Sequence, residues 1–169
     1  VYAFAKKNGF EDSKLQSWDF SYWSEKYQQA EYSLSAEELK PYFQLESCID
    51  AVLGLATRLY GITFTELDDV PVYHPDVKVY EVKDADGRHL ALFYADFFPR
   101  ASKRGGAWMT GFRDQSIVNG VEERPFINIV CNFTKPTADA PSLITHDELT
   151  TFLHEFGHAL HGIFAQGRY

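Results

Sequence analysis

The sequence is poor in cysteine and contains no long apolar run. Its 169 residues include two cysteines, Cys48 and Cys131, each among apolar neighbours. Two cysteines do not make a disulfide framework, so we interpret both as buried free thiols. No apolar run approaches the ~18 residues that a membrane span needs, and we expect no membrane partner.

Basic residues are also scarce. The chain has 16 Lys and Arg against 24 Asp and Glu, a formal net charge of −8 at pH 7. Nucleic-acid binding needs a basic surface, so we expect no nucleic-acid partner. The first ten residues lack the basic flank, apolar stretch and cleavage site of a secretory signal. We expect a cytoplasmic location, with the periplasm as the alternative.

What is present is the composition of a folded domain with a core. Apolar types make up 45% of the chain and charged types 24%. The aromatic share of 16% would suit a peptide-binding cleft, but it would equally suit a large core. Residues 2–7 predict the end of a helix closed by Asn8-Gly9, and the chain stops soon after a strongly patterned helix. We therefore expect residues 1–169 to be a fragment of a longer protein.

The first part of the chain predicts helices. Apolar residues recur with a helical period over 18–32. A second helix is predicted over 36–60, with Ser35 and Glu38 as its capping box and Pro41 in or near its first turn. Gly61 is expected to end this helix.

The middle of the chain predicts a sheet. Residues 77–82 and 90–97 are rich in β-formers and flank the turn 84–87, which indicates an antiparallel hairpin. The apolar run 126–133 suits a buried central strand. The predicted class is α+β: a mainly helical part over 1–75, a small, mostly antiparallel sheet over 76–135, and a helix over 145–166.

Residues 145–161 predict an amphipathic helix with a metal-binding motif. Thr145 and Glu148 form a T-x-x-E capping box, and His154, Glu155 and His158 then form H-E-x-x-H. At about 100° per residue, the two histidines lie within about 40° of each other and one turn apart, so both imidazoles can bind one metal ion. Glu155 lies beside that position, where it can accept a proton from a metal-bound water.

The side of this helix opposite the two histidines should be buried in the core. The apolar residues expected there are Leu149, Phe152, Leu153, Phe156, Leu160 and Ile163. The alternative to a metal site is a pair of structural histidines in a chance H-E-x-x-H. His161 lies about 10 Å along the axis from His154, too far to share its ion, and a packing role is expected. His146 suits a surface or capping role, and nothing marks His74 or His89 as ligands.

A third metal ligand is not apparent. The longer signature H-E-x-x-H-x-x-G-x-x-H fails, because His161 and Phe164 occupy its last glycine and histidine positions. The remaining common option is a carboxylate from a later helix, and only eleven residues follow His158.

Segments along the whole chain resemble one peptidase family. Residues 149–161, with FLHEFGHALH in their middle, resemble the active-site helix of the thimet oligopeptidase, oligopeptidase A and peptidyl-dipeptidase family of zinc peptidases. Further segments resemble that family in the same order: WDFSYW at 18–23, KPYF at 40–43, LYGITF at 59–64, PVYHPDV at 71–77, LFYADFFPR at 92–100, GGAW at 105–108 and CNFTKP at 131–136. Phe97-Phe98, GGAW and HGIFA at 161–165 most resemble the bacterial dipeptidyl carboxypeptidase branch.

The resemblance implies a zincin-like catalytic domain of a mostly helical, two-lobed enzyme with a channel for short peptides. His154 and His158 would bind zinc and Glu155 would be the general base. The third ligand would be a downstream glutamate in the remainder of the parent catalytic domain, so the fragment alone should be inactive. The dipeptidyl carboxypeptidase branch releases C-terminal dipeptides, although these residues do not separate exopeptidase from endopeptidase activity.

The family also uses a sheet edge beside the metal helix to pair with the substrate backbone. The residues expected there are Gly105, Gly106, Ala107 and Gly111, and the alternative is an ordinary loop. A different functional class also stays open, namely a non-catalytic domain that binds peptides without a metal.

Overall fold

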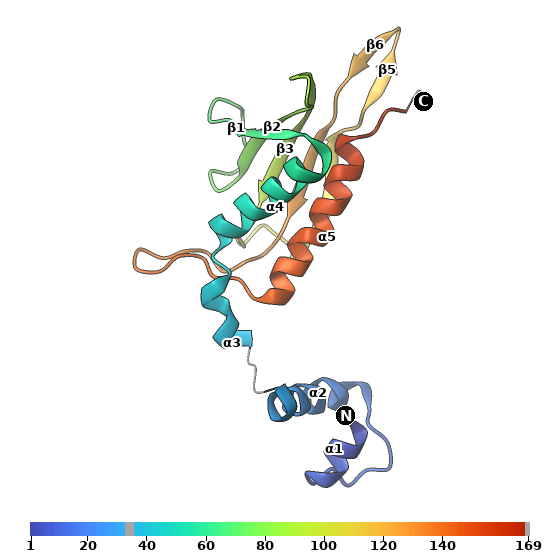
Figure 1. Cartoon of the computed structure of the whole chain (residues 1–169), viewed down its shortest axis with the longest axis vertical. Helices are drawn as coiled ribbons and strands as arrows, with labels where there is room; N and C mark the ends of the chain where they lie inside the picture. The colour runs from blue at the N-terminus through green and yellow to red at the C-terminus, as the bar shows by residue number, and fades with distance from the viewer. Residues whose placement is uncertain (33–35, 168–169) are drawn as a thin grey trace. The chain divides into compact units, whose positions relative to one another are not determined.

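The computed structural model describes residues 1–32 and 36–167. They form two compact units with a boundary between Pro41 and Tyr42 (Figure 1). No helix among the described residues is both long and apolar enough to cross a membrane.

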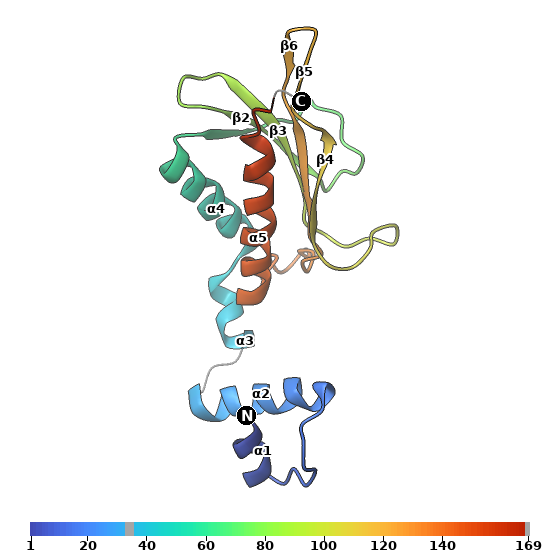
Figure 2. The ribbon, with the colours of Figure 1, turned by 90° about the vertical axis from the view of Figure 1, so that its right-hand side faces the viewer.

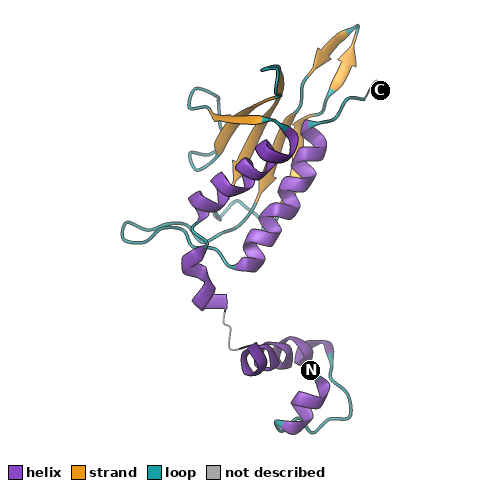
Figure 3. Cartoon of the chain, viewed as in Figure 1, coloured by secondary structure: helices purple, strands orange, loops and turns teal. Residues whose placement is uncertain are grey.

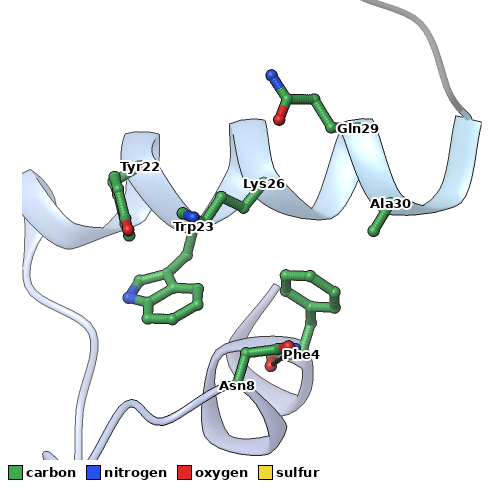
Figure 4. A pocket seen from close by; sticks show the side chains of 7 residues that line it. All are labelled: Phe4, Asn8, Tyr22, Trp23, Lys26, Gln29 and Ala30. Atoms are coloured by element: carbon green, nitrogen blue, oxygen red, sulfur yellow. Dashed lines mark hydrogen bonds between the residues drawn. The ribbon is translucent and has the colours of Figure 1, made fainter.

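The smaller unit holds α1 (Tyr2–Lys7), α2 (Ser17–Tyr32) and α3 (Ala36–Leu39). The predicted helix end at Asn8-Gly9 is confirmed, since Asn8 is the C-cap and Gly9 has a φ of +97°. Phe4 of α1 contacts the rings of Trp23 and Tyr27 on α2, with centroid distances of 6.4 and 5.3 Å. An open hollow of about 490 Å³ lies between α1 and α2. Figure 4 shows the side chains that line it, with the Phe4 and Trp23 rings side by side.

The predicted single helix over 36–60 is wrong. The chain forms α3, then a 3₁₀ turn η1 (Lys40–Tyr42), then α4 (Leu45–Tyr60). Pro41 lacks an amide hydrogen and disfavours helical backbone in the residue before it, so it interrupts the helix. Phe43 instead accepts a backbone hydrogen bond from Ile144, and Gln44 forms a β-bridge with Leu143. The predicted Ser35 cap lies outside the described residues.

The predicted end of this helix is confirmed. Gly61 is the C-cap of α4, with a φ of +72° and its N–H bonded to the carbonyl of Thr57. A φ in this left-handed region favours glycine, because other side chains crowd the backbone there.

The larger unit contains a five-stranded sheet with the order β1-β2-β3-β7-β4. The strands are β1 (Thr63–Glu66), β2 (Lys78–Lys83), β3 (His89–Asp96), β4 (Trp108–Arg113) and β7 (Phe126–Val130). The β2–β3 hairpin and the interior position of β7 are confirmed. Only β3 and β7 pair in parallel, so the sheet is mixed and the α+β class is confirmed. A separate ribbon, β5 (Ser116–Val118) and β6 (Val121–Glu123), lies between β4 and β7 in the sequence.

Helices α4 and α5 (His146–Ile163) lie on one face of this sheet (Figures 2 and 3). Alternate strand residues face the helices, as the period of two requires. The main core combines both helices with these strand residues, among them Val82, Phe93, Ile127 and Ile129. Val77, Val79 and Tyr94 form a smaller apolar cluster apart from this core.

The prediction for Cys48 and Cys131 is confirmed, because both are buried free thiols.

Candidate functional site

Helix α5 begins where the capping box predicts. The Thr145 hydroxyl accepts a hydrogen bond from the Glu148 N–H at 3.1 Å, and the Glu148 carboxylate accepts one from the Thr145 N–H at 2.7 Å. Asp147 and Glu148 place negative charge in the first turn, where the helix dipole favours it. The start of α5 is therefore fixed by local sequence.

The other end of α5 is held by a residue that the sequence did not single out. Arg124 is only 9% exposed, and its guanidinium donates to the carbonyls of Ile163 at 2.8 Å and Ala165 at 3.2 Å. The same side chain donates to the carbonyl of Leu90 on β3 at 2.8 Å. Arg124 thus ties the last turn of α5 to the sheet, and no local pattern in the sequence indicates this.

The buried arc of α5 is narrower than predicted. Phe152, Phe156 and Ile163 are buried, whereas Leu149 and Leu160 are half-buried. The placement of Leu153 in the core is wrong, because its side chain is 41% exposed beside α4. The core stripe follows positions 152, 156, 159 and 163, and one residue past Phe152 the helix has turned about 100° away from it.

The two histidines of the motif converge on one point. His154 and His158 are both exposed, and their Nε2 atoms lie 3.2 Å apart. Their rings are nearly perpendicular, at 81°, with centroids 4.8 Å apart. Two nitrogens bound at about 2.0–2.1 Å to one tetrahedral zinc ion would lie about 3.3 Å apart. The pair therefore fits two corners of a zinc tetrahedron.

Glu155 differs from its neighbours in burial. Its side chain is only 8% exposed, and its carboxylate forms no hydrogen bond or ion pair with the described residues. Burial raises the pKa of the nearby Cys131 thiol to about 12, and the charges of Glu155 and Glu148 add to that effect. Glu155 is thus a carboxylate at the rim of the core with acceptor capacity left for a water molecule.

Two imidazoles are all that the described residues bring together here. Residues 1–32 and 36–167 contain no group of three or more His, Cys, Asp or Glu side chains that could hold a metal ion. His161 and His146 are exposed, His146 lying against Phe43. His74 accepts the Asp76 N–H, and His89 contacts Glu81.

The glycine-bearing segment lies at the sheet edge. Gly111 is in β4, which among the described strands pairs with β7 alone, and Gly105, Gly106 and Ala107 lie in the loop that leads into this strand. A hollow of about 350 Å³ separates the loop from the first turns of α5, and its lining residues are Gly106, Ala107, Asn132, Phe133, Glu148 and Thr151. The edge strand and the motif helix are therefore neighbours.

A buried ionic cluster supports the same loop. Asp96 ends β3 with 1% exposure and accepts hydrogen bonds from Arg100, Lys103 and Tyr73 at 2.8–3.0 Å. Burial raises the pKa of Asp96, but these hydrogen bonds outweigh it, so the pKa lies below its ordinary value. Burial and the bond to Asp96 raise the pKa of Tyr73 to about 12. No local pattern in the sequence indicates this cluster, because Arg100 and Lys103 reach Asp96 from an irregular loop.

Comparison with known proteins gives one family. Dipeptidyl carboxypeptidase of Salmonella typhimurium is 49% identical over 156 residues, which cover 92% of this chain and 23% of that protein. Dipeptidyl carboxypeptidase of Escherichia coli is 48% identical over 155 residues, 91% of this chain and 22% of that protein.

Oligopeptidase A of Escherichia coli is 43% identical over 160 residues, 94% of this chain and 23% of that protein. The chain thus spans about a quarter of the length of these relatives. Residues 2–169 match Peptidase family M3. The resemblance predicted from the sequence is confirmed: the chain belongs to Peptidase family M3.

Proposed function

We propose that this chain is a fragment of the zincin-like catalytic domain of a zinc metallopeptidase that hydrolyses short peptides. His154 and His158 would supply two zinc ligands, and Glu155 would be the general base. The observation that carries the proposal is the 3.2 Å separation of the two Nε2 atoms, which suits ligands of one tetrahedral ion. We infer that the third ligand is a carboxylate elsewhere in the longer polypeptide, since the relatives are about four times as long as the matched segment.

The chemistry is addition of water across the scissile amide. A zinc ion held by His154 and His158 would supply the Lewis acidity for the carbonyl and the water. Glu155 accepts the proton as the water oxygen bonds to the carbonyl carbon, and it then donates that proton to the leaving nitrogen as the C–N bond breaks. Its position next to His154, with no hydrogen-bond partner among the described residues, suits this transfer.

The same proposal covers substrate and location. The backbone of an extended peptide would pair with the edge strand β4, guided by Gly105, Gly106, Ala107 and Gly111. The two relatives named dipeptidyl carboxypeptidase support release of C-terminal dipeptides by the full-length enzyme. A further relative, from Arabidopsis thaliana, is named a probable cytosolic oligopeptidase A, which supports a cytoplasmic location.

The experiment that tests the proposal is Glu155→Gln in the full-length enzyme. The amide cannot accept the proton, so kcat for a short peptide should fall by about 10²–10⁴-fold. Metal analysis should show zinc content equal to that of the wild type, because Glu155 is not a ligand. Glu46→Gln, at an exposed position on α4, is the matched control and should leave kcat unchanged.

Two results would refute the proposal. One is a fully active Glu155→Gln enzyme. The other is peptide hydrolysis that survives complete removal of the metal by a chelator, or peptide binding with no hydrolysis at all, which would favour the non-catalytic alternative.

A further inference from the structure

Asn132 is bonded to the loop that leads into the edge strand. Its side-chain amide nitrogen donates to the carbonyl of Arg104 at 2.9 Å and to the carbonyl of Gly106 at 2.7 Å. An amide NH₂ group has two hydrogens, so this one side chain commits both donors to the loop. The two carbonyls lie two residues apart and are held at a single point.

The loop is anchored at its beginning as well. The Lys103 ammonium group donates to the Asp96 carboxylate at 3.0 Å, to the Asp96 carbonyl at 2.9 Å and to the Phe98 carbonyl at 2.8 Å. The Lys103 side chain is only 2% exposed, so water screens these contacts little. Lys103 and Asn132 therefore restrain both ends of the segment 98–106.

The restrained segment forms one wall of the hollow beside α5. Gly106 and Ala107 line it on the loop side, and Glu148 and Thr151 line it on the helix side. Thr151 lies three residues before His154, about 4.5 Å along the helix axis. Gly106 has a φ of +90°, so the backbone conformation at this wall is one that most side chains disfavour.

We propose that Asn132 is a positioning residue for peptide substrates. By holding the carbonyls of Arg104 and Gly106, it fixes the backbone of residues 105–107 across the hollow from α5, at the start of β4 where an extended peptide would begin to pair. Gly105 and Gly106 lack side chains, which leaves that backbone open to a ligand. This inference rests on the proposed peptidase function, and the ligand class is the extended backbone of a short peptide.

The test compares two inhibitors in the full-length zinc enzyme carrying Asn132→Asp. A carboxylate cannot donate, and it repels both carbonyl oxygens. A peptide hydroxamate reaches both the metal and the loop, and its inhibition constant should rise about tenfold. Acetohydroxamate reaches only the metal, and its constant should change by less than about twofold. Zinc content should stay unchanged, and the amides of residues 104–107 should exchange hydrogen faster.

Asn119→Asp is the matched control, because it makes the same chemical change in the exposed β5–β6 turn. It should change neither inhibition constant. Asn132→Ala removes the donors without adding charge and should weaken the peptide hydroxamate in the same selective way. Unchanged peptide binding in both Asn132 variants, equal weakening of both inhibitors, or loss of zinc would overturn the inference.

Failure of the proposed function would look different. In that case the wild-type enzyme would not bind acetohydroxamate, which reaches only the metal, even if it still bound the peptide hydroxamate. Selective failure of this inference requires a wild type that binds both.

Discussion

The buried carboxylate of Asp96 accepts hydrogen bonds from two cations and one phenol. Because these bonds depend on its negative charge, protonation of Asp96 should weaken them. Arg100 binds both of its oxygens, and Lys103 and Tyr73 each bind one. Removing one partner of a buried ion pair leaves an uncompensated charge, which is strongly destabilising. Asp96 thus ties Arg100 and Lys103 of the β3–β4 loop to the end of β3.

The Asp96 cluster predicts a specific dependence on pH. The folded-state pKa of Asp96 lies below its ordinary value, so its stabilisation is present above the unfolded pKa of about 3.9 and is lost as the pH falls through the lower, folded pKa. Urea unfolding should show that Asp96→Asn is less stable than the wild type at pH 6. The difference should shrink as the pH falls below about 4, because the wild type then loses the same charge.

Asp139→Asn, in an exposed loop, is the comparison for Asp96 and should give equal stability at every pH. If the stability difference between the wild type and Asp96→Asn stayed constant down to pH 2.5, the stabilisation could not come from the ionised carboxylate of Asp96.

At the scale of elements, α5 is fixed at both ends by different means. The capping box belongs to adjacent residues, but Arg124 reaches the last turn from the segment between β6 and β7. Since the H-E-x-x-H motif lies between these two points, both determine where His154 and His158 lie relative to the sheet.

Arg124→Lys should destabilise the fold by about 1–3 kcal/mol. Lysine lacks the planar fork that reaches three carbonyls at once, so buried acceptors would lose their donors. The change can be measured as a shift of the urea midpoint. Arg88→Lys replaces an arginine in an exposed ion pair and should leave the midpoint nearly unchanged. Equal midpoints for Arg124→Lys and the wild type would show that α5 does not need this clamp.

At the scale of the whole molecule, an apolar groove runs between α4 and α5. Its exposed members include Leu55 at 40%, Leu59 at 64% and Leu153 at 41%. Contiguous exposed apolar surface of this kind marks a contact site. We propose that the rest of the longer polypeptide covers it.

The chain of residues 1–169 alone should therefore self-associate, bind zinc weakly and hydrolyse no peptide. Light scattering should show species larger than a monomer, and Leu55→Lys with Leu153→Lys should reduce them, because the charges oppose burial of the groove. Thr150→Lys with Ala138→Lys adds the same two charges at exposed positions outside the groove and is the control. A strictly monomeric wild-type chain, or chelator-sensitive hydrolysis by it, would contradict this expectation.

Sequence patterns predicted an element correctly where neighbouring residues alone determine it. The β2–β3 hairpin follows from β-rich runs around a turn, and the start of α5 follows from Thr145 and Glu148. The error over 36–60 arose because the capping box of Ser35 and Glu38 predicted one helix that tolerates Pro41 near its first turn, whereas the backbone of Phe43 and Gln44 pairs with residues about 100 positions later. Leu153 was misplaced because the spacing of apolar residues does not fix which side of a helix meets the sheet.

The sequence by itself determined the capped helix and the convergence of His154 and His158, because both depend on residues at most four positions apart and on the fixed geometry of one helical turn. Only the tertiary structure decided that Arg124 clamps the end of that helix, that Asp96 ends its strand under a cluster of cations, and that Asn132 reaches back to residues 104 and 106. Asn132 and Arg124 act across 26–41 positions of sequence, and such contacts exist only once the strands have paired and the helices have packed on them.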